Sequence, residues 1–152
     1  MRRSAGKLLL ALTVAVTTSC APRTPRAIAW GREACAHCHM TLADHRFAAE
    51  LLTRAGRAVV FDDIGCMAAW MRDNPSPGAS AWVASFTSPD TWLRADSAVY
   101  LQAESLGTPM GSGLAALRRS EADSVHQAMG GTLRPWRDVL ASPPDHALPG
   151  TR

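Results

Sequence analysis

The chain has 152 residues and a formal net charge of +3 at pH 7. The first 19 residues hold three bases and no acid, so the remaining 133 carry a net charge of zero, which argues against a nucleic-acid-binding protein. Lys7 is the only lysine, so chemistry that needs a lysine amine is excluded beyond this first segment.

Residues 1–19 have the organisation of a secretory signal peptide. A basic start is followed by an apolar run over residues 8–16, which is too short to span a bilayer, and by small residues that lead to Cys20. Ser19-Cys20 fits the end of a bacterial lipoprotein signal, although Thr17 stands where leucine is usual. We therefore expect Cys20 to carry a lipid anchor and residues 20–33 to form a flexible tether. The alternative is ordinary cleavage nearby, with Cys20 left as a spare thiol.

The first half of the remaining chain predicts two strands, a helix and a third strand. Residues 47–52 and 58–61 are predicted as strands. A helix is predicted from a cap at Asp62 or Asp63 to about Arg72, because apolar residues recur there at helical spacing on one face: Ile64, Met67, Ala68 and Met71. Residues 81–86 follow as a strand, after a stop rich in proline.

The second half repeats this order. Strands are predicted over residues 98–101 and 113–117. Ser120 is expected to cap a short helix that ends at Gly130-Gly131, and residues 132–136 form the last strand.

These patterns predict an α+β fold of two related ββαβ units packed together, treble-clef-like, with short helices on small sheets. The units span about 34–90 and 91–140 within one domain, 34–140. Each unit is too small to be stable alone, so the two are expected to share a core. Residues 141–152 are expected to be a disordered tail.

The segment from Cys35 to Met40 holds five metal-binding side chains in six residues. Thiolate, imidazole and thioether ligands together favour Cu(I) or another soft late metal. A Cys-x-x-Cys turn places the sulfurs of Cys35 and Cys38 on one side of a loop, and Met40 can point the same way.

Two other interpretations of the Cys-x-x-Cys pair remain open. It can be a disulfide or a thiol redox motif, although no strand precedes it. It can also belong to a structural zinc site, but such a site needs two further ligands, and the nearest downstream cysteine is Cys66 on the predicted helix.

Met110 lies on a glycine-flanked loop, Thr108-Pro109-Met110-Gly111-Ser112-Gly113, with no apolar neighbour beside it. A methionine with nothing local to pack on is a candidate metal ligand. Cys66 and Met129 are predicted to be core residues. Three histidines are expected to have no role in metal binding: His45, His126 and His146. Adjacent Asp62 and Asp63 are interpreted as a helix cap rather than as catalytic acids.

Three segments together resemble the NosL family of copper-binding lipoproteins, which are accessory proteins of nitrous-oxide reductase. They are Cys35-Ala36-His37-Cys38-His39-Met40, then Phe61-Asp62-Asp63-Ile64-Gly65-Cys66-Met67, then Thr108-Pro109-Met110-Gly111-Ser112-Gly113-Leu114. Their order and distances match from about Cys20 to Leu140. Residues 136–140 are also similar to the family's closing strand and turn. One departure is His39, in a slot often held by glycine.

The resemblance implies a Cu(I) metallochaperone, held by its lipid on the periplasmic side of the membrane. It implies that copper is handed to apo nitrous-oxide reductase, and to other copper-handling proteins, while copper centres assemble. By position, Cys38 is the principal thiolate and Met110 the partner thioether, with Met40 and Cys35 in support. No catalysis is expected, since no nucleophile–base pair is evident. The rivals are a thiol–disulfide oxidoreductase that uses Cys35 and Cys38, and a structural zinc module.

Overall fold

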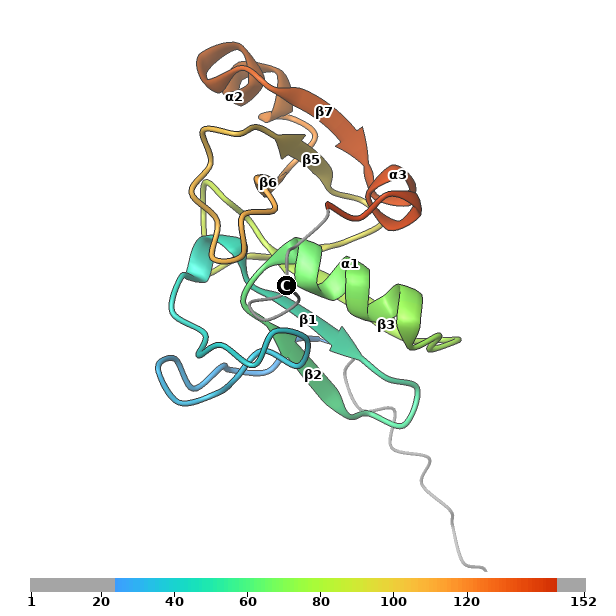
Figure 1. Ribbon diagram of the computed structural model, residues 1–152. Coiled ribbons are helices and arrows are strands. Elements are labelled where there is room, and N and C mark those ends of the chain that lie inside the picture. Colours follow the sequence, from blue (N-terminus) through green and yellow to red (C-terminus); the bar gives the residue numbers. More distant parts are fainter. Residues whose placement is uncertain (1–23, 145–152) are drawn as a thin grey trace, which may run out of the picture.

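Two small antiparallel sheets organise the computed structural model, which describes residues 24–144 (Figure 1). The first sheet has the order β2-β1-β3-β4 and contains β1 (Ala49–Leu52), β2 (Ala58–Phe61), β3 (Ser80–Ala84) and β4 (Trp92–Arg94). The second has the order β6-β5-β7 and contains β5 (Val99–Gln102), β6 (Leu114–Leu117) and β7 (Thr132–Pro135). The helical elements are η1 (His45–Phe47), α1 (Ile64–Asp73), α2 (Ala122–Met129) and α3 (Trp136–Ala141).

The order strand-strand-helix-strand occurs twice along the chain, as β1-β2-α1-β3 and as β5-β6-α2-β7. The predicted α+β class, with short helices on small sheets, is confirmed. The predicted signal peptide, the lipidation site Cys20 and His146 lie outside the described residues.

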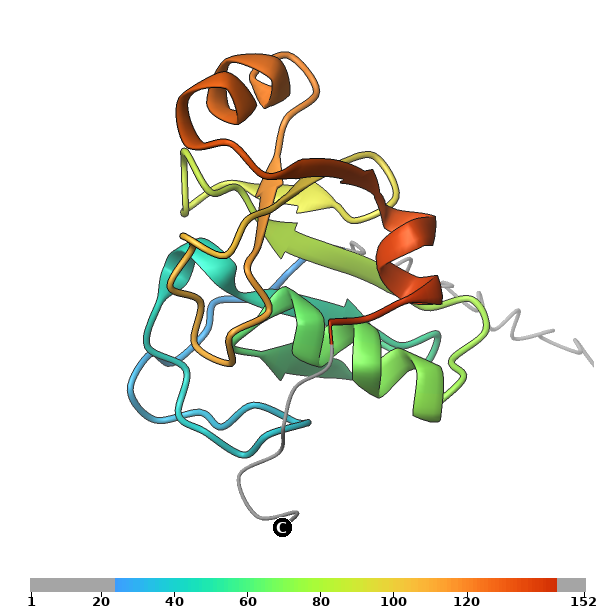
Figure 2. The same cartoon turned by 45° about the horizontal axis from the view of Figure 1, so that its top comes forward.

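Helix α1 lies between the two sheets, and α2 covers the far side of the second sheet (Figures 1 and 2). Side chains alternate between the faces of a strand, so β5 sends Tyr100 to one side and Leu101 to the other. Tyr100 belongs to the main core around α1, and Leu101 belongs to a second cluster that includes Ala122 of α2. The second sheet is therefore buried on both faces, and α1 is enclosed by both halves of the chain.

The strand boundaries differ from the prediction in the first half. β1 begins at Ala49, because Asp44 caps the η1 turn through Arg46 N–H and the chain enters the sheet only after Phe47. β3 ends at Ala84 rather than at residue 86. The short strand β4 was not predicted, because three residues are too few to show an alternating pattern.

Two predictions for the last helices are wrong. Ser120 does not cap α2; the N-cap is Glu121, which makes no side-chain cap bond because its carboxylate accepts hydrogen bonds from Arg118 N–H and the Thr87 hydroxyl. Residues 136–141 form α3 rather than the end of a strand. Pro135 occupies the N-cap of α3, and the buried Trp136 and Val139 lie one turn apart on its inner face.

Part of the segment assigned to the tether contacts the domain. The backbone N–H of Arg26 donates to Glu50 of β1 at 3.1 Å, and Ile28 is buried in the main core. Among residues 24–144, no helix is long and apolar enough to cross a membrane.

Candidate metal centre

The Cys-x-x-Cys pair, Cys35 and Cys38, lies on a tight turn. Cys35 N–H donates to the carbonyl of Met40 at 2.8 Å, and His39 N–H donates to the carbonyl of Cys35 at 3.0 Å. His39 has a φ of 64°, in the left-handed region that favours glycine, which accounts for a glycine being usual at this position in the family it resembles. Ala36 N–H donates to Val60 at 3.0 Å and fixes the turn against β2.

The connection from β2 to α1 supplies the other side of the site. Asp63 caps α1, because its Oδ1 accepts the N–H of Gly65 at 2.7 Å, so the prediction of a cap at Asp62 or Asp63 is confirmed. Asp62 is therefore free to point elsewhere, and its Oδ1 accepts a hydrogen bond from the Cys38 thiol at 3.4 Å. Cys66 lies in the first turn of α1.

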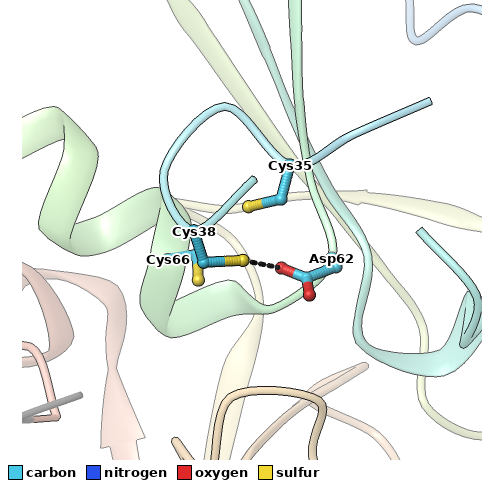
Figure 3. Close-up of side chains that lie close together, drawn as sticks. All are labelled: Cys35, Cys38, Asp62 and Cys66. Atoms are coloured by element: carbon cyan, nitrogen blue, oxygen red, sulfur yellow. Dashed lines mark hydrogen bonds between the residues drawn. The ribbon is translucent and has the colours of Figure 1, made fainter. Parts of the chain in front are cut away.

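Four side chains converge where these two segments meet (Figure 3). The ligand atoms of Cys35, Cys38, Cys66 and Asp62 all lie within 4.8 Å of one another. Cys35, Cys66 and Asp62 are buried and Cys38 is half-buried, so Cys38 is the side through which the cluster meets solvent. All three cysteines are free thiols.

The donor set fits a metal ion. Thiolates are ligands for soft and borderline metals, and a carboxylate oxygen adds a harder donor. Asp62 Oδ2 is buried and has no hydrogen-bond partner among the described residues, and a cation would satisfy such an atom.

The three thiols have different affinities for protons. A hydrogen bond from the Cys66 thiol lowers the pKa of Cys35 from 9.0 to about 7, against the opposing effect of burial. The contact with Cys35 and burial both raise the pKa of Cys66. Burial raises the pKa of Cys38 to about 12. Cys35 is therefore the thiol that loses its proton most readily, and a metal that takes all three thiolates must displace protons from the other two.

The predicted ligand Met110 is carried to this region by the second half of the chain. Its backbone N–H donates to Asp63 Oδ2 at 3.1 Å, and its half-buried side chain packs against the main core. Met40 is 45% exposed and is the one large hydrophobic side chain that lies open to solvent in the described part of the chain.

Two members of the cluster, Cys66 and Asp62, were not predicted as ligands from the sequence. Cys66 is buried in the core, as predicted, but its sulfur also faces the sulfurs of Cys35 and Cys38. One signal for this was available: residues 64–69 contain no polar side chain, and a helix that is apolar on all sides is buried on all sides. Asp62 was interpreted only as part of a cap, and no local pattern distinguishes it from Asp63.

His45 and His126 lie outside the cluster. The ring of His45 stacks on Trp30 at 3.7 Å between centroids, and His126 Nε2 lies 3.1 Å from the carbonyl oxygen of Gly131. The two further ligands that a zinc site needs beside Cys35 and Cys38 are present in the folded protein, because Cys66 and Asp62 lie in the same cluster.

Both the sequence and the fold are similar to those of known proteins. The sequence profile of the NosL family matches residues 28–142. The fold is similar to the crystal structure of the copper chaperone NosL from Shewanella denitrificans, with a TM-score of 0.66 and 17% identity, over 78% of this chain and 96% of that one. No curated protein sequence matches the chain.

Proposed function

The chain belongs to the NosL family, and from this membership and its buried thiol cluster we propose that it binds Cu(I) and delivers it to a partner protein. The observation that carries the proposal is the convergence of three free thiols within 4.8 Å of one another. Thiolates and thioethers are the ligands that Cu(I) prefers, so the donors match the cargo.

We assign the thiolates of Cys38, Cys35 and Cys66 and the thioethers of Met110 and Met40 as the candidate ligands. Cys66 is an addition to the set proposed from the sequence, and it rests on the position of its sulfur. Met110 is included in the candidate set because its loop is hydrogen-bonded to Asp63, which lies next to Asp62 and three residues before Cys66.

The burial of the donors suggests a direction for transfer. The half-buried Cys38 and the exposed Met40 are the donors that an incoming ion or partner meets first, and Cys35 and Cys66 lie behind them. A partner that offers soft ligands can displace the outer donors before the inner ones. The ion then passes between proteins without being free in water.

We further propose that the recipient is apo nitrous-oxide reductase and that the protein acts at the periplasmic side of the membrane through a lipid on Cys20. The support is the family and the leader sequence. Incubation of the copper-loaded protein with the apo-reductase should generate the visible absorption of its copper centres. If the copper-loaded protein kept all of its copper, the proposal that the reductase is the recipient would be wrong.

A thiol–disulfide oxidoreductase is the less favoured alternative, for an electrostatic reason. Such enzymes lower the pKa of the exposed attacking cysteine. Here the half-buried Cys38 has a raised pKa and the lowered pKa belongs to the buried Cys35. The thiol that a disulfide substrate could reach is thus the weaker nucleophile at neutral pH.

A structural zinc module is the second candidate, favoured by the presence of four donors of zinc-binding type in one cluster. It predicts that removal of the metal unfolds the domain. A copper carrier should keep its fold when it is empty, because Cys35 and Cys66 are only two of the many residues that form its two hydrophobic clusters.

The first experiment is a competition titration. The reduced protein from Ala21 onward is titrated with Cu(I) in competition with a chromophoric chelator, and Zn(II) is titrated in parallel. Circular dichroism then shows whether the protein stripped of metal is folded. Tight one-to-one Cu(I) binding by a protein that is folded without metal supports the proposal. Preference for Zn(II) together with unfolding on stripping would establish the zinc module instead.

The ligand role of Met110 is tested with a matched pair of variants. Met110→Ile should weaken Cu(I) binding severalfold or more and leave the fold intact. Met129→Ile is the control, since Met129 is the last residue of α2 and packs against the second hydrophobic cluster, which contains none of the thiols. Equal Cu(I) affinity in the two variants would remove Met110 from the site.

A further inference from the structure

The loop that carries Met110 is held in a fixed shape by its own residues. Thr108 Oγ1 accepts the N–H of Gly113 at 3.1 Å, and Ser112 Oγ accepts the N–H of Leu114 at 3.2 Å. The two hydroxyls lie 3.3 Å apart, and Gly111 N–H donates to the carbonyl of Thr108 at 3.1 Å. Such a loop can be placed as a unit by a single contact with the rest of the protein.

Asp63 makes that contact. Its carboxylate is fully buried and bridges the two halves of the chain: Oδ1 accepts the N–H of Gly65 at 2.7 Å and Oδ2 accepts the N–H of Met110 at 3.1 Å. One oxygen therefore fixes the first turn of α1, which carries Cys66, and the other fixes the loop that carries Met110. Asp62, immediately before Asp63, contacts Cys38.

We propose that Asp63 is the positioning residue of the copper site, which holds Met110 of the second half in register with the thiols of the first half. This inference rests on the proposed function, because it assumes that the thiols and Met110 bind one ion. Asp63 is not one of the four residues whose ligand atoms converge, and each of its oxygens accepts a backbone N–H. A carboxylate presents two separate oxygens, one for each of these N–H groups, whereas a hydroxyl presents one oxygen.

Asp63→Ser should keep the contact of residue 63 with Gly65 N–H and remove its contact with Met110 N–H. Serine is as good an N-cap as aspartate, so the start of α1 is retained, but its side chain has no second oxygen to accept the N–H of Met110. Loss of a partner that orients a ligand commonly weakens metal binding by about 10–100-fold, and we expect a loss of Cu(I) affinity in that range. Asp63→Asn is the second variant: it keeps the size of aspartate but has only one acceptor oxygen for the two N–H groups.

A purely electrostatic role of Asp63 also predicts a weaker site, because a nearby negative charge attracts a cation. The two roles differ in the Met110→Ile background, where the effect of the charge persists and the effect of positioning Met110 disappears.

The deciding measurement is a double-mutant cycle on the purified protein, with Cu(I) affinity read by competition with a chromophoric chelator. If Asp63 acts through Met110, Asp63→Ser has no further effect in a Met110→Ile background. Amide hydrogen exchange of the metal-free protein gives a second readout, in which Asp63→Ser should deprotect the N–H of Met110. Asp44→Asn is the matched control, because Asp44 caps η1 through Arg46 and makes no contact with Met110.

The outcomes separate the two levels of the proposal. Wild-type protein that fails to bind Cu(I) overturns the proposed function, and this inference with it. Wild-type protein that binds Cu(I), with Asp63→Ser and Asp63→Asn unchanged in affinity, or with effects that add to that of Met110→Ile, overturns the inference alone. Weaker binding that vanishes in the Met110→Ile background supports it.

Discussion

Replacing Cys66 by alanine removes the thiol that stabilises the Cys35 thiolate at the buried side of the cluster. Cys66 is fully buried, so the substitution leaves a small cavity in place of one sulfur atom. Truncations of this size cost about 1 kcal/mol, and a small domain is typically stable by roughly 5–15 kcal/mol. The variant should therefore fold, and its effects can be assigned to the lost thiol.

The effect on Cys35 follows from the causes of its shifted pKa. The hydrogen bond from Cys66 is the largest factor that lowers it from 9.0 to about 7, and burial opposes that shift. Without the donor, the pKa of Cys35 should return to 9.0 or above. At pH 7 the thiolate fraction of Cys35 then falls from about one half to about 1% or less. Cu(I) binding should weaken by more than the roughly 100-fold that loss of an outer partner causes, since a ligand and the main thiolate are lost together.

The assay is a pH titration of the reduced, metal-free protein, followed by the ultraviolet absorbance of the thiolate. The wild-type protein should show one thiolate step near pH 7, and Cys66→Ala should move this step upward by about two pH units or more. Cys38→Ala is the matched control, because it removes a neighbouring thiol and leaves the Cys66–Cys35 contact in place. A step near pH 7 that persists in Cys66→Ala would refute this account of the cluster.

Two further predictions concern the stability of the fold. Gly113→Ala should destabilise the protein by about 2–4 kcal/mol in urea unfolding, because φ is +63° and the added Cβ would lie 2.7 Å from the carbonyl oxygen of Ala103. Gly111→Ala is the control: φ is +73° but the space around the added Cβ is open, so this variant should lose only about 1–2 kcal/mol. Equal losses of unfolding free energy in the two variants would contradict the steric argument. Arg26 lowers the pKa of Glu33 from 4.5 to about 2, so the stability that this pair adds is present above about pH 4.5 and is lost as the pH falls towards 2. Between these pH values the free energy of unfolding should fall by up to about 1 kcal/mol more in the wild-type protein than in Glu33→Gln, a small difference because the pair lies at the surface. Parallel acid-unfolding curves for the two proteins would show that the pair contributes nothing to stability.

Local sequence patterns were sufficient to predict the main elements of the fold and the Cys-x-x-Cys turn. Alternation and turn residues identified β2 at its observed bounds, and helical spacing after two aspartates identified α1 and its cap. Cys35 and Cys38 could be paired because two residues between them allow both sulfurs to meet on one loop. These inferences succeeded because each depends on residues within one or two turns of each other.

Which donors meet depends on long-range packing. Cys66 lies off the stripe of Ile64, Met67 and Ala68, so helical periodicity does not direct it towards the cysteine turn; it meets that turn because α1 is enclosed on several sides and the turn is fixed to β2. Met110 is 47 residues from Asp63, and the hydrogen bond between them exists only because the second sheet packs against α1. A site shared by two halves of a chain depends on long-range packing, and short-range sequence patterns carry no information about that packing.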